Sequence, residues 1–270
     1  AHGFTQLELD EEAIVNGRVH VHRAAGVLPG GTPFSIPDRD LPPVGRAVEE
    51  RFPVNEPEIP VYLGLRVHRP GQAEVAEIAE GALSEARYGA TAARLPDEST
   101  GADEREIRVA RANLRLLFAD ESPGDYEALP LARIVRRPEG GFAYKADYVP
   151  PCLALAASPY LQRLLRKLLE IMVTRADGLS ARRRFTGKGV AEFGRDDTVA
   201  FWFLGAVNGH IPVLGHRLRS AHEHPEAVYA DLAGLAGQLT TLSDMQVRDI
   251  PAYDHDNATA AFTDLAQRIT

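Results

Sequence analysis

The sequence predicts a multidomain α+β protein, with an antiparallel β-sandwich over residues 1–152 followed by an antiparallel four-helix bundle over residues 153–270. Two observations predict this division. Before about residue 150 apolar residues tend to alternate with polar ones, whereas after Pro150-Pro151 they recur at i, i+3 and i+4. A third is the length, because 270 residues are enough for two domains that each bury a core.

The N-terminal half contains short segments with the period-two pattern of half-buried strands. In one of them Val61, Leu63 and Leu65 point to one side and the polar residues between them to the other. Residues 129–135 and 142–144 flank a Pro-Glu-Gly-Gly sequence, which predicts a β-hairpin. We expect these strands to be antiparallel.

The connections in this half are also informative. Proline and glycine recur in residues 24–60, which excludes long helices there. An alternating run begins at Ile107 and continues to Leu116, whereas residues 72–86 are compatible with one short helix.

The first helix of the C-terminal half is the strongest helical pattern in the chain. Ser158 is a good N-cap residue and Pro159 suits the first helical position. About seven turns follow, with apolar residues at helical spacing. These residues are Leu161, Leu164, Leu165, Leu168, Leu169, Met172, Ala176 and Leu179.

A polar linker, residues 182–194, separates this helix from the next. Asp196 and Asp197 are candidate caps, and residues 201–204 are apolar on all sides, which predicts a central position for this helix. Pro212 should kink it before it resumes. Two further helices are expected, one after His224-Pro225 and one after the N-cap Asn257, so that four helices form a bundle.

The apolar face of the first helix has two interpretations. Leu161, Leu165, Leu168 and Met172 are the candidate core or subunit-seam positions. The face is widened by Leu164, Leu169, Ile171 and Val173. It is either the core of the bundle or, in part, the interface of a homo-oligomer.

Composition and charge exclude several classes of function. Lys and Arg number 30 against 38 Asp and Glu, a net charge of -8, which argues against nucleic acid as a main partner. Cys152 is the single cysteine, so no intrachain disulfide forms and a cytoplasmic location is expected. No apolar run approaches the length of a membrane span, so we expect no direct membrane insertion. The sequence contains no recognisable cofactor-binding motif, so we expect no cofactor.

Two clusters contain residue types that bind metals or transfer protons. His20 and His22, two apart on a strand, are compatible with two metal ligands, but no third ligand is evident, which favours a solvated strand face. Asp254, His255 and Asp256, or the pair His222 and His224, permit a metal-assisted hydrolase as an alternative function. A turn and a helix cap are the favoured interpretations, so we expect no enzyme.

Several segments occur in an order that resembles a known family. In the N-terminal half they are residues 31–34 (GTPF), 62–65 (YLGL), 112–118 (ANLRLLF), 129–134 (LPLARI) and 148–153 (YVPPCL). In the helical half they are Asn208, Pro212, His216, residues 224–226 (HPE) and residues 251–255 (PAYDH). Together they resemble the TssK family, also called ImpJ or VasE, of baseplate components of the bacterial type VI secretion system.

The resemblance implies a structural protein without catalysis, built from a β-sandwich shoulder, a helical neck and a small C-terminal head, and assembled as a homotrimer. It implies that the shoulder binds the baseplate wedge proteins TssF and TssG and that the head binds the membrane-complex proteins TssL and TssM. The trimer would thus link the wedge to the membrane complex, in the cytoplasm at the inner face of the membrane. Because the chain stops at Thr270, where the neck should end, we expect a truncated member without the head. A carbohydrate- or receptor-binding sandwich is a weaker alternative.

Overall fold

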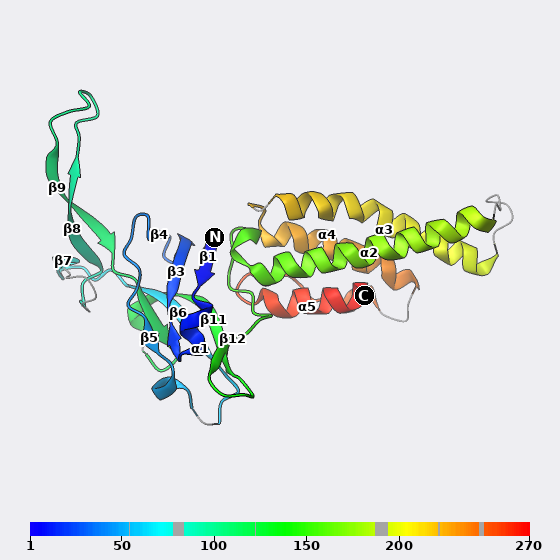
Figure 1. Ribbon diagram of the computed structural model, residues 1–270, viewed down its shortest axis with the longest axis horizontal. Coiled ribbons are helices and arrows are strands. Elements are labelled where there is room, and N and C mark those ends of the chain that lie inside the picture. Colours follow the sequence, from blue (N-terminus) through cyan, green and yellow to red (C-terminus); the bar gives the residue numbers. More distant parts are fainter. Residues whose placement is uncertain (54, 78–83, 122, 187–193, 221, 243–245) are drawn as a thin grey trace. The chain divides into compact units, whose positions relative to one another are not determined.

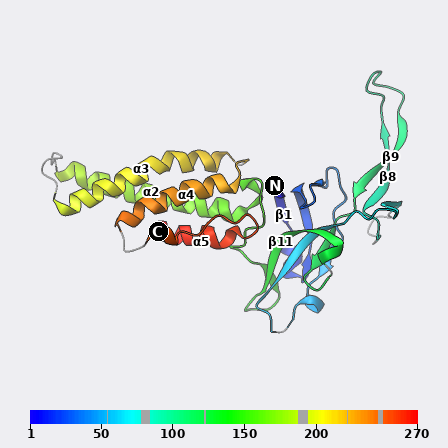
Figure 2. The same cartoon turned by 180° about the vertical axis from the view of Figure 1, so that it is seen from behind.

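The computed structural model of this chain divides into two compact units, Ala1–Tyr148 and Val149–Thr270 (Figure 1 and Figure 2). The structure describes residues 1–53, 55–77, 84–121, 123–186, 194–220, 222–242 and 246–270. Strands dominate the first unit and helices the second, as predicted. The division falls after Tyr148, slightly before the predicted domain boundary at residue 152.

The strands of the first unit form four sheets among the described residues, with strand orders β10-β6-β11-β12, β1-β3-β4, β7-β8-β9 and β2-β5. The strands are β1 (Gly3–Leu9), β2 (Arg18–Val19), β3 (Val21–Val27), β4 (Pro33–Ile36), β5 (Arg46–Ala47), β6 (Glu58–Arg66), β7 (Val75–Glu77), β8 (Tyr88–Leu95), β9 (Arg105–Ala112), β10 (Arg115–Phe118), β11 (Tyr126–Arg136) and β12 (Phe142–Tyr144). The short helices are α1 (Glu11–Val15), η1 (Glu49–Arg51) and η2 (Pro123–Asp125).

The sheet around β6 agrees with the sequence pattern. Val61, Leu63 and Leu65 are fully buried, and β6 pairs antiparallel with β10 and β11. The predicted hairpin is the pair β11 and β12, joined by a turn in which the Arg137 N–H donates to the Gly141 carbonyl at 3.1 Å. Gly141 has a φ of +79°, a conformation that glycine adopts without strain.

Two predictions for residues 72–116 are wrong. Residues 75–77 form strand β7 instead of a helix, and β7 pairs parallel with β8, so not every pair is antiparallel; residues 78–83 lie outside the described residues. The run from Ile107 is split into β9 and β10, which belong to different sheets. The break lies at Asn113, whose side-chain amide donates to the Ser84 and Ala86 carbonyls.

The second unit contains four helices of eight residues or more among its described residues (Figure 1). They are α2 (Pro159–Thr186), α3 (Arg195–Arg219), α4 (Pro225–Leu239) and α5 (Ala258–Ile269), with short turns η3 (Leu155–Ala157), η5 (Thr240–Leu242) and η6 (Val247–Asp249). The predicted start of α2 is confirmed, since the Ser158 hydroxyl accepts the Leu161 N–H at 3.3 Å. The start of α4 is confirmed as well, since His224 Nδ1 accepts the Glu226 N–H at 3.2 Å.

The other helix ends differ in detail from the predictions. Helix α2 continues to Thr186, into the expected linker, of which residues 187–193 lie outside the described part. Asp197 lies in the first turn of α3 and accepts the Gly194 N–H at 3.1 Å, so it is not the N-cap. Helix α3 continues through Pro212 as a single helix. Helix α5 starts after Asn257, whose side chain makes no capping hydrogen bond.

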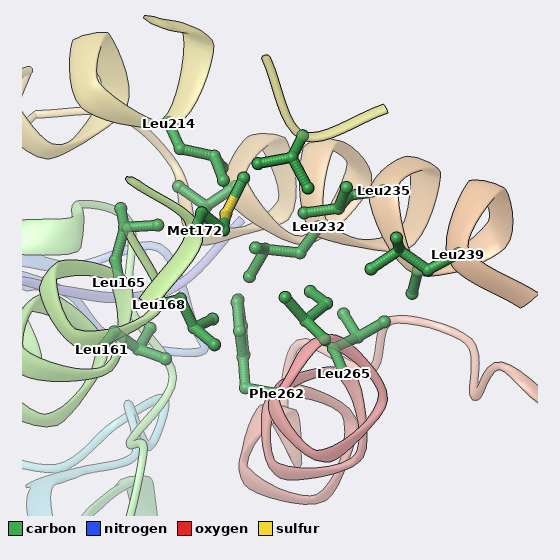
Figure 3. Packing of buried hydrophobic residues seen from close by; sticks show 14 of the residues in the cluster. Leu161, Leu165, Leu168, Met172, Leu214, Leu232, Leu235, Leu239, Phe262 and Leu265 are labelled. Carbon is green, nitrogen blue, oxygen red and sulfur yellow. The ribbon is translucent and has the colours of Figure 1, made fainter. Parts of the chain in front are cut away.

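One hydrophobic core joins all four helices (Figure 3). Helix α2 contributes Leu161, Leu165, Leu168 and Met172, which lie close to Leu232 and Leu235 of α4 and to Phe262 and Leu265 of α5. Leu204, Val207 and Leu214 contribute the buried face of α3. The second unit therefore has a core of its own.

Candidate interaction surface

The four positions proposed as core or subunit seam lie inside the core of a single chain. Leu161, Leu165, Leu168 and Met172 are each at most 2% exposed. A side chain this deeply buried within one chain offers almost no area to a second copy. A subunit seam in this unit would therefore have to use other side chains.

The apolar opening of α3 is largely exposed, so the prediction that this helix is central is wrong. Trp202 is 65% exposed and Phe201 is 42% exposed, and only Leu204 in this segment is buried. Helix α3 has 25 residues and α4 has 15, which correspond to about 37 Å and about 22 Å of helix. Helices α2 and α3 therefore extend beyond α4 and α5 (Figure 1).

A second apolar stripe follows a largely exposed side of α3. We call it the α3 outer stripe; its residues are Val199, Trp202, Ala206, Gly209 and Val213. Their spacing alternates between three and four residues, the pattern of a helix–helix seam. Trp202 and Val213 are exposed, and a Cβ atom added at Gly209 would have no neighbouring atom within 4 Å. Helix α3 thus has a second apolar face, which the chain covers only at Ala206, where the side chain packs against the core.

An open hollow adjoins this stripe. It has a volume of about 690 Å³ and lies between α2, α3 and η5. Its lining includes Leu179, Val199, Phe203 and Leu242. Val199 belongs both to the hollow and to the α3 outer stripe, so the apolar surface is continuous across this end of the unit. Contiguous exposed apolar surface of this kind marks interaction sites.

Judged by length and composition alone, α3 could also cross a membrane. An 18-residue window within Asp197–Arg219 has a mean hydropathy of 1.3. The expectation that no segment is long and apolar enough for a membrane span is therefore wrong. Core helices of soluble proteins pass the same test, and the buried Leu204, Val207 and Leu214 give α3 a core face.

The polar cluster near the C-terminus is a turn packed on a helix cap. The Asp256 N–H donates to Asp254 Oδ1 at 3.0 Å, and the Tyr253 hydroxyl lies 3.3 Å from His255 Nδ1. The His255 ring stacks on His224 at a centroid distance of 5.4 Å. Burial, and then the charge of His255, lowers the pKa of His224, which favours the neutral ring that accepts the capping hydrogen bond.

These residues do not assemble a hydrolase centre. Within the part of the chain that the structure describes, Asp254, His255 and Asp256 do not bring three metal-ligating atoms close together; such a group occurs elsewhere in the chain. Burial raises the pKa of the Cys152 thiol to about 12, so it is no nucleophile near neutral pH. The alternative of a metal-assisted hydrolase is therefore not supported.

His20 and His22 have a neighbour that the sequence pattern did not reveal. Asp10 lies beside them, with its Oδ2 atom 3.3 Å from His22 Nε2 and 3.8 Å from His20 Nδ1. The donor atoms of the three residues all lie within 4.8 Å of one another. A sequence signal for Asp10 exists, because an Asp followed by Glu11-Glu12 is typical of a helix start. The pairing of β1 with β3 that brings it to the histidines is not visible in local sequence.

Comparison with known proteins identifies relatives over the whole chain. A family model described as bacterial type VI secretion, VC_A0110, EvfL, ImpJ, VasE matches residues 1–270. The type VI secretion system baseplate component TssK1 of Pseudomonas aeruginosa is 33% identical over 264 residues, which cover 96% of this chain and 57% of TssK1. This chain therefore spans little more than half the length of that relative.

Solved structures are similar to this chain in fold as well. The TssK-TssF-TssG baseplate subcomplex determined by cryo-electron microscopy contains a chain with a TM-score of 0.83 and 26% identity, covering 99% of this chain and 85% of that one. A chain of the type VI secretion system baseplate complex has a TM-score of 0.85 and 28% identity, covering 99% of this chain and 60% of that one. The similarity extends across both units.

Proposed function

Because the chain belongs to the VasE (ImpJ) family of bacterial type VI secretion proteins, we propose that it is a structural, non-enzymatic part of the secretion baseplate that assembles as a homotrimer. Family membership over residues 1–270 supports the baseplate role, and so do relatives that are named baseplate components.

We propose that the two units are the shoulder and the neck of this family. The shoulder is a β-sandwich that ends at Tyr148 instead of the predicted residue 152, and the neck is a four-helix bundle that starts at Val149. The separate sheets of the first unit and the shared core of the four helices support this assignment.

The observation that carries the trimer is the α3 outer stripe. Its alternating spacing is that of a coiled-coil seam, and Gly209, which has no side chain, allows close approach of another helix. The core already uses the opposite face through Leu204 and Val207. We propose that equivalent stripes from three copies pack around the symmetry axis of the trimer.

We propose that this packing, rather than membrane insertion, covers the apolar side of α3. A membrane span would have to separate α3 from α2 and α4, with loss of the core contacts of Leu204, Val207 and Leu214. The Asn208 and His216 side chains would also enter the hydrocarbon region without a partner helix.

The proposed partners are the baseplate wedge proteins. A relative of this chain is part of a TssK-TssF-TssG subcomplex, so we propose that the shoulder binds TssF and TssG. Contact with the membrane-complex proteins TssL and TssM would go through a head outside these 270 residues, at the cytoplasmic face of the membrane. The net charge of -8 argues against nucleic acid as a partner.

Replacing Trp202 by Lys tests the seam. Trp202 is 65% exposed in the single chain, so Trp202→Lys should leave the fold intact while it places a charge in the trimer seam. Light scattering should give a trimer for the unmodified chain and a monomer for the variant, both with the same circular dichroism. Val247→Lys, which replaces another exposed apolar residue of the same unit, is the matched control and should remain trimeric. A trimeric Trp202→Lys would refute the proposed seam.

A further inference from the structure

We propose that Asp10, His20 and His22 form a binding site for a divalent transition-metal ion, with Zn²⁺ as the best fit. Asp10 lies between β1 and α1, His20 lies between β2 and β3, and His22 lies in β3. The site lies within the first unit and does not depend on the proposed baseplate role.

The donor set matches the chemistry of zinc. Two imidazole nitrogens and one carboxylate oxygen suit Zn²⁺, whereas Ca²⁺ and Mg²⁺ prefer oxygen ligands alone. Bonds of about 2.0–2.2 Å in a tetrahedral site place neighbouring donor atoms about 3.3 Å apart. Asp10 Oδ2 and His22 Nε2 are already 3.3 Å apart, and His20 Nδ1 is 3.8 Å from the same oxygen.

The carboxylate is held in place by bonds that leave one oxygen available. Asp10 Oδ1 caps α1, where it accepts the Glu12 N–H at 3.0 Å and the Ala13 N–H at 2.8 Å. The Asp10 N–H donates to the His20 carbonyl at 3.1 Å, which joins the two segments next to the site. Partners of this kind orient a ligand before the metal binds.

Ion pairing of the two histidines with Asp10 is the simpler explanation, but at 3.8 Å from Asp10 Oδ2 the His20 Nδ1 atom is too far away for a hydrogen bond. His20 Nδ1 is shielded from solvent and has no hydrogen-bond partner within the described ranges. A buried nitrogen without a partner is unfavourable, and a metal ion shared with Asp10 and His22 would use its lone pair.

The exposure of the site leaves room for metal entry and for a further ligand. The His22 side chain is 54% exposed and that of His20 is 40% exposed. Three protein ligands leave the fourth position of a tetrahedral ion to water. Because the ligands join the turn before α1 to the start of β3, bound metal should stabilise the folded first unit.

Isothermal titration of the untagged 270-residue chain with ZnCl₂ tests the site. We expect saturable binding of one Zn²⁺ per chain and a higher melting temperature with the metal. His20→Ala and His22→Ala should each weaken binding by more than about tenfold. Asp10→Asn should weaken it as well, and because Asn also caps helices the fold should be retained.

His68→Ala is the matched control. His68 is also exposed and lies 3.1 Å from a single carboxylate, that of Glu74, without a second histidine in that pair. The His68→Ala variant should bind Zn²⁺ like the unmodified chain. Co²⁺ should give a visible absorption band with His68→Ala but not with His22→Ala. No saturable binding at one equivalent, unchanged binding by His22→Ala, or equal loss in His68→Ala would each overturn the proposal.

Discussion

Replacing Leu168 by Ala tests the packing of the helical core. Leu168 is 1% exposed and lies in the core that joins α2, α4 and α5 (Figure 3). Loss of three buried carbons removes about 2.4 kcal/mol of transfer free energy at about 0.8 kcal/mol per methylene. The cavity left behind raises the expected loss of unfolding free energy to about 3–5 kcal/mol.

Urea unfolding followed by far-ultraviolet circular dichroism measures this loss. Leu242→Ala makes the same chemical change at a side chain that is 36% exposed and by the same arithmetic should cost about 1.5 kcal/mol, well below the loss for Leu168→Ala. Both variants have to be compared at one protein concentration, because assembly adds to apparent stability. A loss below about 1 kcal/mol for Leu168→Ala would refute its placement in a tightly packed core.

Two predictions concern the charged groups of the first unit. Arg87 is 7% exposed and donates a hydrogen bond to Glu127 at 2.8 Å. Arg87→Met leaves the Glu127 carboxylate without this partner and should lower the unfolding free energy by about 3 kcal/mol. The control Arg108→Met removes an exposed ion pair and should change the unfolding free energy by less than about 0.5 kcal/mol. Equal effects in urea titrations would contradict the buried pair. Hydrogen bonding from Lys145 lowers the pKa of Glu58 in the folded protein. The ionised Glu58 therefore stabilises the fold above the unfolded pKa of about 4.3, and this stabilisation is lost as the pH falls through the lower folded pKa. The loss of unfolding free energy between about pH 7 and about pH 3 should be smaller in Glu58→Gln; an equal loss would show that Glu58 does not contribute.

Local patterns predicted the elements that short-range forces determine. Alternation around Val61 to Leu65 identified β6, and the Pro-Glu-Gly-Gly sequence identified the hairpin of β11 and β12. Ser158-Pro159 and His224-Pro225 marked the starts of α2 and α4, because caps act on the first turn of their own helix. The positions of the buried leucines on α2 followed from helical periodicity.

Features that depend on distant parts of the chain could not be predicted in this way. The exposure of Trp202 depends on which face of α3 packs into the core, and an opening that is apolar on all sides does not reveal that face. The neighbour of His20 and His22 is Asp10, which the register of β1 on β3 brings into place. Strand β7 is three residues long and pairs parallel with β8, so its local pattern was too short to separate strand from helix.

The mass of the 270-residue chain in solution tests the central claim most directly. Light scattering over a range of protein concentrations should give a species of three times 29.4 kDa. That result would agree with a trimer held by the α3 outer stripe and neighbouring surface. A mass of 29.4 kDa at every concentration would contradict the proposal that these two units form the trimer.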